Sequence, residues 1–251
     1  MKLARGLILP VLLVLLFESL WRILALRSEA LAPPSAIGIA FIGAVQDGTL
    51  LQASIETIGS AAIGLVVGGL IGTIGGIALG FSAWLARCSF LTVEAMRAIP
   101  AIALMPLVML VYGFGYRTEI TIIAFATVWP TLLIAQQAVR GITREQIELA
   151  HLLQLGRAKT LVAIVLPAIT PRLFTAFRLS ASLALVVAVT VEIFGNPQGL
   201  GYAIAISEQN LDPAQSLAML LWVGVFGYFL NLLLVAGQNR LFLQQRDVAV
   251  P

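Results

Sequence analysis

Residues 55–86 read IETIGSAAIGLVVGGLIGTIGGIALGFSAWLA, and this stretch decides the architecture of the chain. A helix needs roughly 20 mostly apolar residues to cross the hydrocarbon core of a bilayer. The segment Ile55–Ala86 exceeds that length, so we expect a membrane-spanning helix that tilts or projects from the membrane.

Glycine recurs every four residues within the same stretch, and Gly69 and Gly75 lie beside this series. Such positions follow one slowly rotating stripe on a helix, where small residues let a second helix backbone come close. The spacing predicts tight helix packing, with a direct role in the substrate path as the alternative. The stripe consists of Gly64, Gly68, Gly72, Gly76 and Gly80.

The rest of the chain has the same character. Of its 251 residues, 60% are hydrophobic and 11% are charged, against about 25% charged in soluble domains. We therefore predict an all-α membrane protein, with residues 1–251 forming a single transmembrane domain of about six helices. The other five predicted spans are Leu7–Leu26, Ala95–Tyr112, Ile120–Val139, Leu173–Phe194 and Leu217–Val235. Pro100 and Pro106 interrupt the span Ala95–Tyr112 and predict a kinked backbone there.

Basic residues predict the orientation, because cytoplasmic segments carry an excess of Lys and Arg. With both termini in the cytoplasm, ten basic residues fall inside and only Arg27 and Arg117 fall outside. The inside set is Lys2, Arg5, Arg87, Arg140, Arg144, Arg157, Lys159, Arg172, Arg240 and Arg246.

The first span has a rival interpretation as a cleaved signal peptide, since Ala30-Leu31-Ala32 resembles a peptidase site. Its apolar run is longer than the usual 7–15 residues. It also carries Glu18 and Arg22, whose i, i+4 spacing allows an ion pair. We expect the span to be retained.

Two segments outside the spans have predicted structure. The outside segment 27–52 contains Pro33-Pro34 and then a short interfacial helix over Ser35–Val45, capped by Ser35. The inside segment 141–171 predicts a helix capped by Thr143 and running to about Leu155, a turn at Gly156, and a second helix that stops before Pro167. This segment is longer than a simple connection requires, which indicates a docking surface.

Several classes of site are disfavoured. Cys88 and His151 are the only cysteine and histidine, so a zinc site within this chain is not expected. Neither Lys2 nor Lys159 follows a glycine-rich phosphate loop. We expect a non-catalytic chain without a metal or cofactor of its own, and no nucleic-acid partner.

Ionisable residues inside spans are costly and therefore informative. Glu94, Arg97 and Arg178 lie near the inner ends of their spans, where they can extend to the interface. Glu192 lies at the outer end of its span and is a candidate for the pathway, for an outer gate, or for capping a loop.

The inside loop carries a recognisable pattern. Glu148-Leu149-Ala150, followed by Ile164, Leu166 and Pro167 in register, resembles the EAA signature of permease subunits of bacterial ATP-binding-cassette importers. Leu149 replaces the middle alanine of that signature. Gln154 occupies its glycine position, with Gly156 two residues later.

Further segments resemble the nitrate, sulfonate and taurine importer permeases, in the same order along residues 50–235. They are Arg97-Ala98-Ile99-Pro100-Ala101-Ile102-Ala103 with Pro106-Leu107, then Tyr112-Gly113-Phe114-Gly115, Trp129-Pro130, Glu192 and Gly199-Leu200-Gly201-Tyr202. Ala98 and Ala101 stand where prolines are common in that group.

The resemblance implies a type I-like importer permease fold in the bacterial inner membrane. It implies a translocation pathway formed by two copies of the chain, two ATPase subunits that bind ATP and magnesium, and an external substrate-binding protein. The implied ATPase-coupling residues are Glu148, Leu149, Ala150, Gln154, Gly156, Arg157, Ile164, Leu166 and Pro167, and the pathway or gate candidates are Arg97, Pro100, Met105 and Glu192. The implied cargo is a small anion such as a sulfonate, nitrate or an aromatic acid, with an uncharged or cationic vitamin precursor as the alternative.

Two other classes of protein fit the sequence less well. A secondary transporter driven by an ion gradient would carry internal repeats and acids near the membrane midplane, and neither is evident. A membrane-embedded enzyme would need convergent nucleophiles, bases or metal ligands, which the residue inventory does not supply.

Overall fold

The computed structural model describes residues 2–24, 28 and 30–242, and within them it contains helices and no strand. The α-helices are α1 (Lys2–Ile23), α2 (Pro34–Gln46), α3 (Thr49–Phe81), α4 (Ala83–Ala98), α5 (Met105–Tyr112), α6 (Tyr116–Arg140), α7 (Arg144–Leu152), α8 (Arg157–Thr160), α9 (Leu166–Gly195), α10 (Gly199–Gln209) and α11 (Pro213–Phe242). A 3-10 turn, η1 (Ala101–Leu104), precedes α5, and a π-helical turn, η2 (Leu161–Val165), precedes α9.

Four of the described helical segments are long and apolar enough to cross a membrane: α3, α6, Leu161–Gly195 and Pro213–Leu241. A fifth span is present if α4 and the η1–α5 segment are counted together. The predicted first span is helical as α1 up to Ile23, while its last residues, 25 and 26, lie outside the described part of the chain. The all-α membrane class is confirmed, and the count of six spans stays a prediction.

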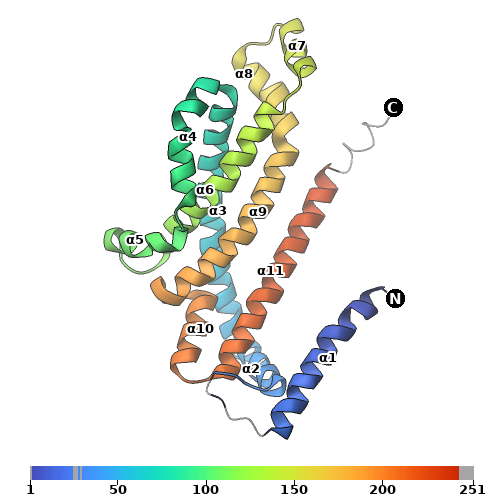
Figure 1. Ribbon diagram of the computed structural model, residues 1–251, viewed down its shortest axis with the longest axis vertical. Coiled ribbons are helices and arrows are strands. Elements are labelled where there is room, and N and C mark those ends of the chain that lie inside the picture. Colours follow the sequence, from blue (N-terminus) through green and yellow to red (C-terminus); the bar gives the residue numbers. More distant parts are fainter. Residues whose placement is uncertain (1, 25–27, 29, 243–251) are drawn as a thin grey trace.

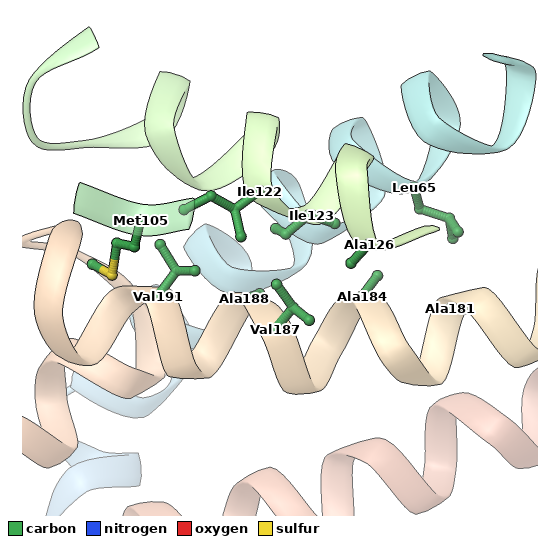
Figure 2. Close-up of a cluster of buried hydrophobic side chains, with 10 residues drawn as sticks. All are labelled: Leu65, Met105, Ile122, Ile123, Ala126, Ala181, Ala184, Val187, Ala188 and Val191. Atoms are coloured by element: carbon green, nitrogen blue, oxygen red, sulfur yellow. The ribbon is translucent and has the colours of Figure 1, made fainter. Parts of the chain in front are cut away.

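Helices α3, α6 and α9 form the centre of the bundle, and α11 and α1 lie to one side of it (Figure 1). Figure 2 shows the main apolar core between α6 and α9. On α9 the core face carries Ala181, Ala184 and Ala188, whose small side chains let the two helices approach closely. Leu65 of α3 and Met105 of α5 complete the cluster.

The glycine stripe of α3 packs directly against α6. A Cβ on Gly64 would lie 2.6 Å from Cβ of Ile123. Side chains at Gly68 and Gly76 would overlap backbone carbonyl oxygens of α6, those of Ala124 and Leu132. The close helix contact that the spacing predicts is therefore present in the structure.

The predicted span Ile55–Ala86 is divided between two helices, α3 and α4. Helix α3 begins at Thr49 and ends at Phe81, five residues before the predicted end at Ala86. Ser82 breaks the helix because its hydroxyl accepts a hydrogen bond from the Leu85 amide at 3.2 Å and so caps α4.

The predicted interruption of Ala95–Tyr112 at Pro100 is confirmed. The chain bends by 86° between α4 and the η1–α5 segment. Ile99 is extended, with φ −72° and ψ 122°, because the residue before a proline is disfavoured in the helical region. Pro106 causes no further break, since it lies in the first turn of α5, where no amide hydrogen is needed.

The short helix predicted over Ser35–Val45 is confirmed as α2, but its predicted cap at Ser35 is wrong. Pro33 is the N-cap residue and Pro34 begins the helix. The amide and hydroxyl of Ser35 instead donate to the Glu18 carboxylate of α1, at 3.1 and 2.9 Å. Glu18 also pairs with Arg22 at 2.7 Å, as the i, i+4 spacing predicts.

In the loop 141–171, the predictions of a turn at Gly156 and of a helix end before Pro167 are both wrong. Helix α7 has a Thr143–Gln146 capping box and ends at Leu152. The residue in the left-handed conformation is Gln154, with φ 49°, and Gly156 is not in that region. The second helix does not stop before Pro167, because α8, η2 and α9 follow one another without a break. The wide π turn places Pro167 in the first turn of α9, where its missing amide hydrogen is tolerated.

Candidate functional site

The α7–α8 loop, residues 141–171, forms one end of the molecule, and α2 and α10 lie at the opposite end (Figure 1). The candidate functional residues lie in two regions. One is this loop, and the other is a cluster of carboxyl groups near α10.

Helix α7 is largely exposed. Ala150, the third residue of the Glu-Leu-Ala sequence, is only 4% exposed, whereas Glu148 and Leu149 face away from the protein. Leu152 and Leu153 are 81% and 59% exposed. A polar helix that presents leucines to solvent at the tip of a protein is a typical docking element.

A groove of about 670 Å³ separates α7 from the end of α3. It is lined by Phe81, Ile147, Ala150, His151, Leu155, Thr160 and Leu161. His151 is one of its walls and is exposed.

The start of α7 carries an ordered acidic group. The Thr143 hydroxyl and the Glu145 backbone amide hydrogen-bond to the Glu145 carboxylate and hold its pKa below the usual range. Glu145 thus stays ionised at the positive end of the α7 dipole, which favours a negative charge.

The second half of the loop is anchored on the bundle. Val165 and Ile169 are buried against Ala138 and Val139 of α6, and Leu166 packs on this cluster. Ile164 is half-buried, and Pro167 is exposed. The side chain of Arg157 lies outside the described part of the structure, as do Arg27 and Arg246.

The four pathway or gate candidates do not form one site. Met105 is 6% exposed and packs in the same core as Val191, next to Glu192 in sequence. Arg97 lies before the α4–α5 bend and pairs with Glu94 at 2.7 Å, and Pro100 is exposed at the bend. Met105 thus packs on α9, the helix that also carries Glu192.

Glu192 belongs to a buried group of polar side chains. The other members of this group were not predicted from the sequence. Glu119 of α6 is 0% exposed and Glu192 of α9 is 1% exposed. The Glu119 carboxylate accepts hydrogen bonds from the Ser60 hydroxyl and the Asn196 amide. Glu56 of α3 lies at the edge of the group. We define the carboxyl cluster as Glu56, Glu119 and Glu192.

The carboxyl cluster holds the first turn of α10. The first three amides of this helix have no partner within it. The Gly199 amide donates to Glu56 at 2.9 Å, the Leu200 amide donates to Thr57 at 2.9 Å, and the Gly201 amide donates to Glu192 at 2.8 Å. Three acceptors from α3 and α9 thus fix α10 in place.

This arrangement explains the Gly199-Leu200-Gly201 sequence. Gly199 has φ +91°, and the Glu192 carboxyl group occupies the space that its Cβ would need. A Cβ on Gly201 would lie 2.7 Å from Cβ of Glu192. In the sequence, the only indication that Glu119 belongs to a buried site is its position directly before the predicted span Ile120–Val139.

Comparison with known proteins agrees with this architecture. Residues 64–244 match the family described as "Binding-protein-dependent transport system inner membrane component". The putative aliphatic sulfonates transport permease protein SsuC of Bacillus subtilis is 26% identical over 205 residues, which cover 82% of this chain and 74% of that protein. The riboflavin transport system permease protein RibX of Chloroflexus aurantiacus is 30% identical, with 72% and 68% covered.

Among solved structures, an inward-facing conformation of the MetNI methionine ABC transporter superposes with a TM-score of 0.65 and 19% identity. The superposition covers 76% of this chain and 94% of that chain. This likeness concerns the fold and supports the type I importer permease architecture. Since the family match extends over well over half of the chain, the protein belongs to the inner-membrane permease components of binding-protein-dependent, ATP-binding-cassette transport systems.

Proposed function

We propose that two copies of this chain form the translocation pathway of an ATP-driven importer, and that the α7–α8 loop couples each copy to an ATPase subunit. ATP and magnesium bind to that subunit, and an external binding protein delivers the cargo. In this arrangement the loop and both termini face the cytoplasm, in agreement with the excess of basic residues there.

The observation that carries the proposal is the exposed face of α7. Glu148, Leu149 and Leu152 are exposed at the end of the molecule, while Ala150 is buried. A short amphipathic helix of this kind fits a groove on a partner protein. The exposed leucines would be covered by that groove.

The way the loop joins the bundle suggests how the coupling works. From Arg157 to Gly195 the backbone stays helical through α8, η2 and α9. Helix α9 alone has 30 residues, which at 1.5 Å per residue is about 45 Å. A displacement of the loop by the ATPase would therefore move α9 as a lever, whose far end carries Glu192.

We place the pathway along α9 and the bent α4–η1–α5 segment, with Met105 and Glu192 near its outer end and Arg97 and Pro100 near the bend. Met105 and Glu192 are buried in the conformation described here. They would come into contact with cargo only when α10 and α5 move away from α9.

For the cargo we favour a small anion such as a sulfonate, nitrate or an aromatic acid, because a sulfonate permease is among the relatives. The riboflavin permease relative favours a second candidate, a vitamin-like organic solute. Uptake of a radiolabelled alkanesulfonate and of riboflavin into proteoliposomes that contain the full complex would separate the two candidates.

The coupling proposal is tested by co-purification in mild detergent, with the bound proteins identified by mass spectrometry and their ATPase activity measured. Wild type should retain an ATPase subunit. Leu152→Glu and Leu149→Arg should lose it while keeping the same size-exclusion profile. Leu31→Glu is the matched control, since Leu31 is an exposed leucine that follows α1 and lies far from the loop in sequence. A complex that withstands both loop variants would refute the docking role of α7.

A further inference from the structure

The hydrogen-bond donors around the carboxyl cluster are distributed unevenly. Glu56 has a donor for each oxygen, with Gln52 at 3.0 Å from Oε1 and the Gly199 amide at 2.9 Å from Oε2. Glu119 also has two, the Ser60 hydroxyl on Oε1 and the Asn196 amide on Oε2. Four donors thus serve two carboxyl groups, and both of these groups act as acceptors only.

Glu192 differs from the other two. Its Oε2 accepts from the Gly201 amide, but its Oε1 is buried and has no hydrogen-bond partner. A buried oxygen without a partner is costly, so this atom requires an explanation. Thr57 is a neighbouring hydroxyl, but its single hydrogen is directed to the Ala53 carbonyl at 3.0 Å, while its oxygen accepts from the Leu200 amide.

The remaining neighbour of Glu192 is a second carboxyl group. Asn196, which donates to the Glu119 carboxylate, lies four residues after Glu192, so α9 brings Glu192 close to Glu119 at the contact between α6 and α9, where both carboxyl groups are buried. Two ionised carboxylates placed together and away from water repel each other strongly, so such pairs hold one proton between them. No Lys or Arg forms an ion pair with either of them among the described residues.

We propose that Glu192 carries a proton on Oε1 and donates it to the Glu119 carboxylate, so that the pair binds a single proton. This assignment gives the unpartnered oxygen a role and leaves Glu119 as the acceptor of three hydrogen bonds. The proton joins α6 to α9, while the other oxygen of Glu192 holds α10. One protonated side chain thus fastens three helices at the end of the molecule opposite the loop.

The same arrangement makes this end of the bundle sensitive to proton loss. The other titratable groups that face the pair are Glu56 on α3 and Tyr116 at the start of α6. Neither supplies a positive charge that could compensate for a second ionised carboxylate. Removal of the proton would therefore push α6 and α9 apart and release the α10 turn, which is how an outer gate could open. The inference rests on the geometry of this chain and does not require coupling to an ATPase.

The test is infrared spectroscopy of the purified permease in lipid at neutral pH, where a protonated carboxyl group gives a carbonyl band separate from the carboxylate and amide bands. Wild type should show one such band, and it should disappear in Glu192→Gln. Glu56→Gln is the matched control, since it changes a carboxylate of the same cluster whose oxygens both already have donors, and the band should persist there. In Glu119→Gln the band should shift or be lost, because this variant removes both the carboxylate acceptor and the negative charge that keep the proton on Glu192.

Glu192→Gln should fold, because its amide can donate to Glu119 and its carbonyl oxygen can accept from Gly201. If it does not fold, carbon-13 solid-state NMR of wild type labelled at the glutamate carboxyl carbons answers the same question. One carboxyl resonance in the protonated range is expected there, and it should persist in Glu56→Gln. Absence of a protonated carboxyl signal in wild type would overturn the proposal, as would a signal that persists unchanged in Glu192→Gln.

Discussion

The carbonyl oxygen of Ala124 on α6 occupies the space that a side chain on Gly68 of α3 would need. The two residues belong to the most extensive helix contact of the described bundle, that between α3 and α6. Backbone atoms form this contact, so no side-chain rotation can relieve an added methyl group. The register of α3 on α6 is thus fixed by the absence of a Cβ.

This relationship gives the first prediction. Gly68→Ala should destabilise the protein by about 1–3 kcal/mol, because an overpacked contact has to displace a helix backbone. Gly69→Ala is the control, since no atom lies within 4 Å of its added Cβ. It should be neutral or stabilising by up to about 1 kcal/mol. Thermal unfolding in detergent followed by size exclusion measures both, and equal effects of the two would show that the stripe is not a packing surface.

The second prediction concerns the loop turn. Gln154 has φ 49°, a conformation that costs about 1–2 kcal/mol for a residue with a side chain. Gln154→Gly should stabilise the turn and slow hydrogen exchange at the Leu155 amide, which donates to the Ala150 carbonyl at 3.0 Å. Gln154→Val should speed that exchange.

Gly156→Ala serves as the counterpart, because Gly156 is not in the left-handed region and its Cβ would meet no atom within 4 Å. Its exchange pattern should match wild type. If Gly156→Ala disrupted the loop while Gln154→Gly had no effect, the turn would be centred on Gly156 as the sequence predicted.

The third prediction concerns the docking of α10. Gly199→Ala should release the first turn of this helix, because Gly199 combines φ +91° with a carboxyl group at the position of its missing Cβ. Hydrogen exchange over residues 199–209 should rise by at least about tenfold, which corresponds to 1.4 kcal/mol of lost local stability. Gly224→Ala on α11, where no atom lies within 4 Å, should leave α10 unchanged.

The fourth prediction concerns the contact between α11 and α3. Trp222 donates from Nε1 to the Ser54 hydroxyl at 2.8 Å, and its ring lies 5.8 Å from that of Phe41. Trp222→Phe keeps an aromatic ring but removes the donor, so it should cost about 0.5–1.5 kcal/mol. A double-mutant cycle with Ser54→Ala measures the pairwise energy. A coupling energy near zero would mean that the bond contributes nothing to holding α11 on the bundle.

Much of this protein follows from its sequence. Apolar runs of more than 18 residues predicted the helices that became α3, α6, α9 and α11, because a bilayer requires such lengths. Pro100 predicted the break before α5, and the Thr143 cap predicted the start of α7. Each of these signals is local, since it depends on hydropathy or backbone chemistry within a few residues. The family resemblance was equally local, because it rested on short motifs in a fixed order.

The tertiary structure decided the rest. Glu119 and Asn196 are 77 residues apart, and their contact depends on how α6 and α9 are rotated and at what depth they pack. Gln154 takes the left-handed turn although Gly156 is nearby, and the Leu155 amide after it donates to the Ala150 carbonyl of α7 at 3.0 Å. Glu192 is a second example. The sequence shows only an acidic residue at the end of a span, whereas the packing of α6 on α9 buries it close to Glu119. Contacts between distant segments depend on helix rotation and packing, and a pattern within one segment does not contain that information.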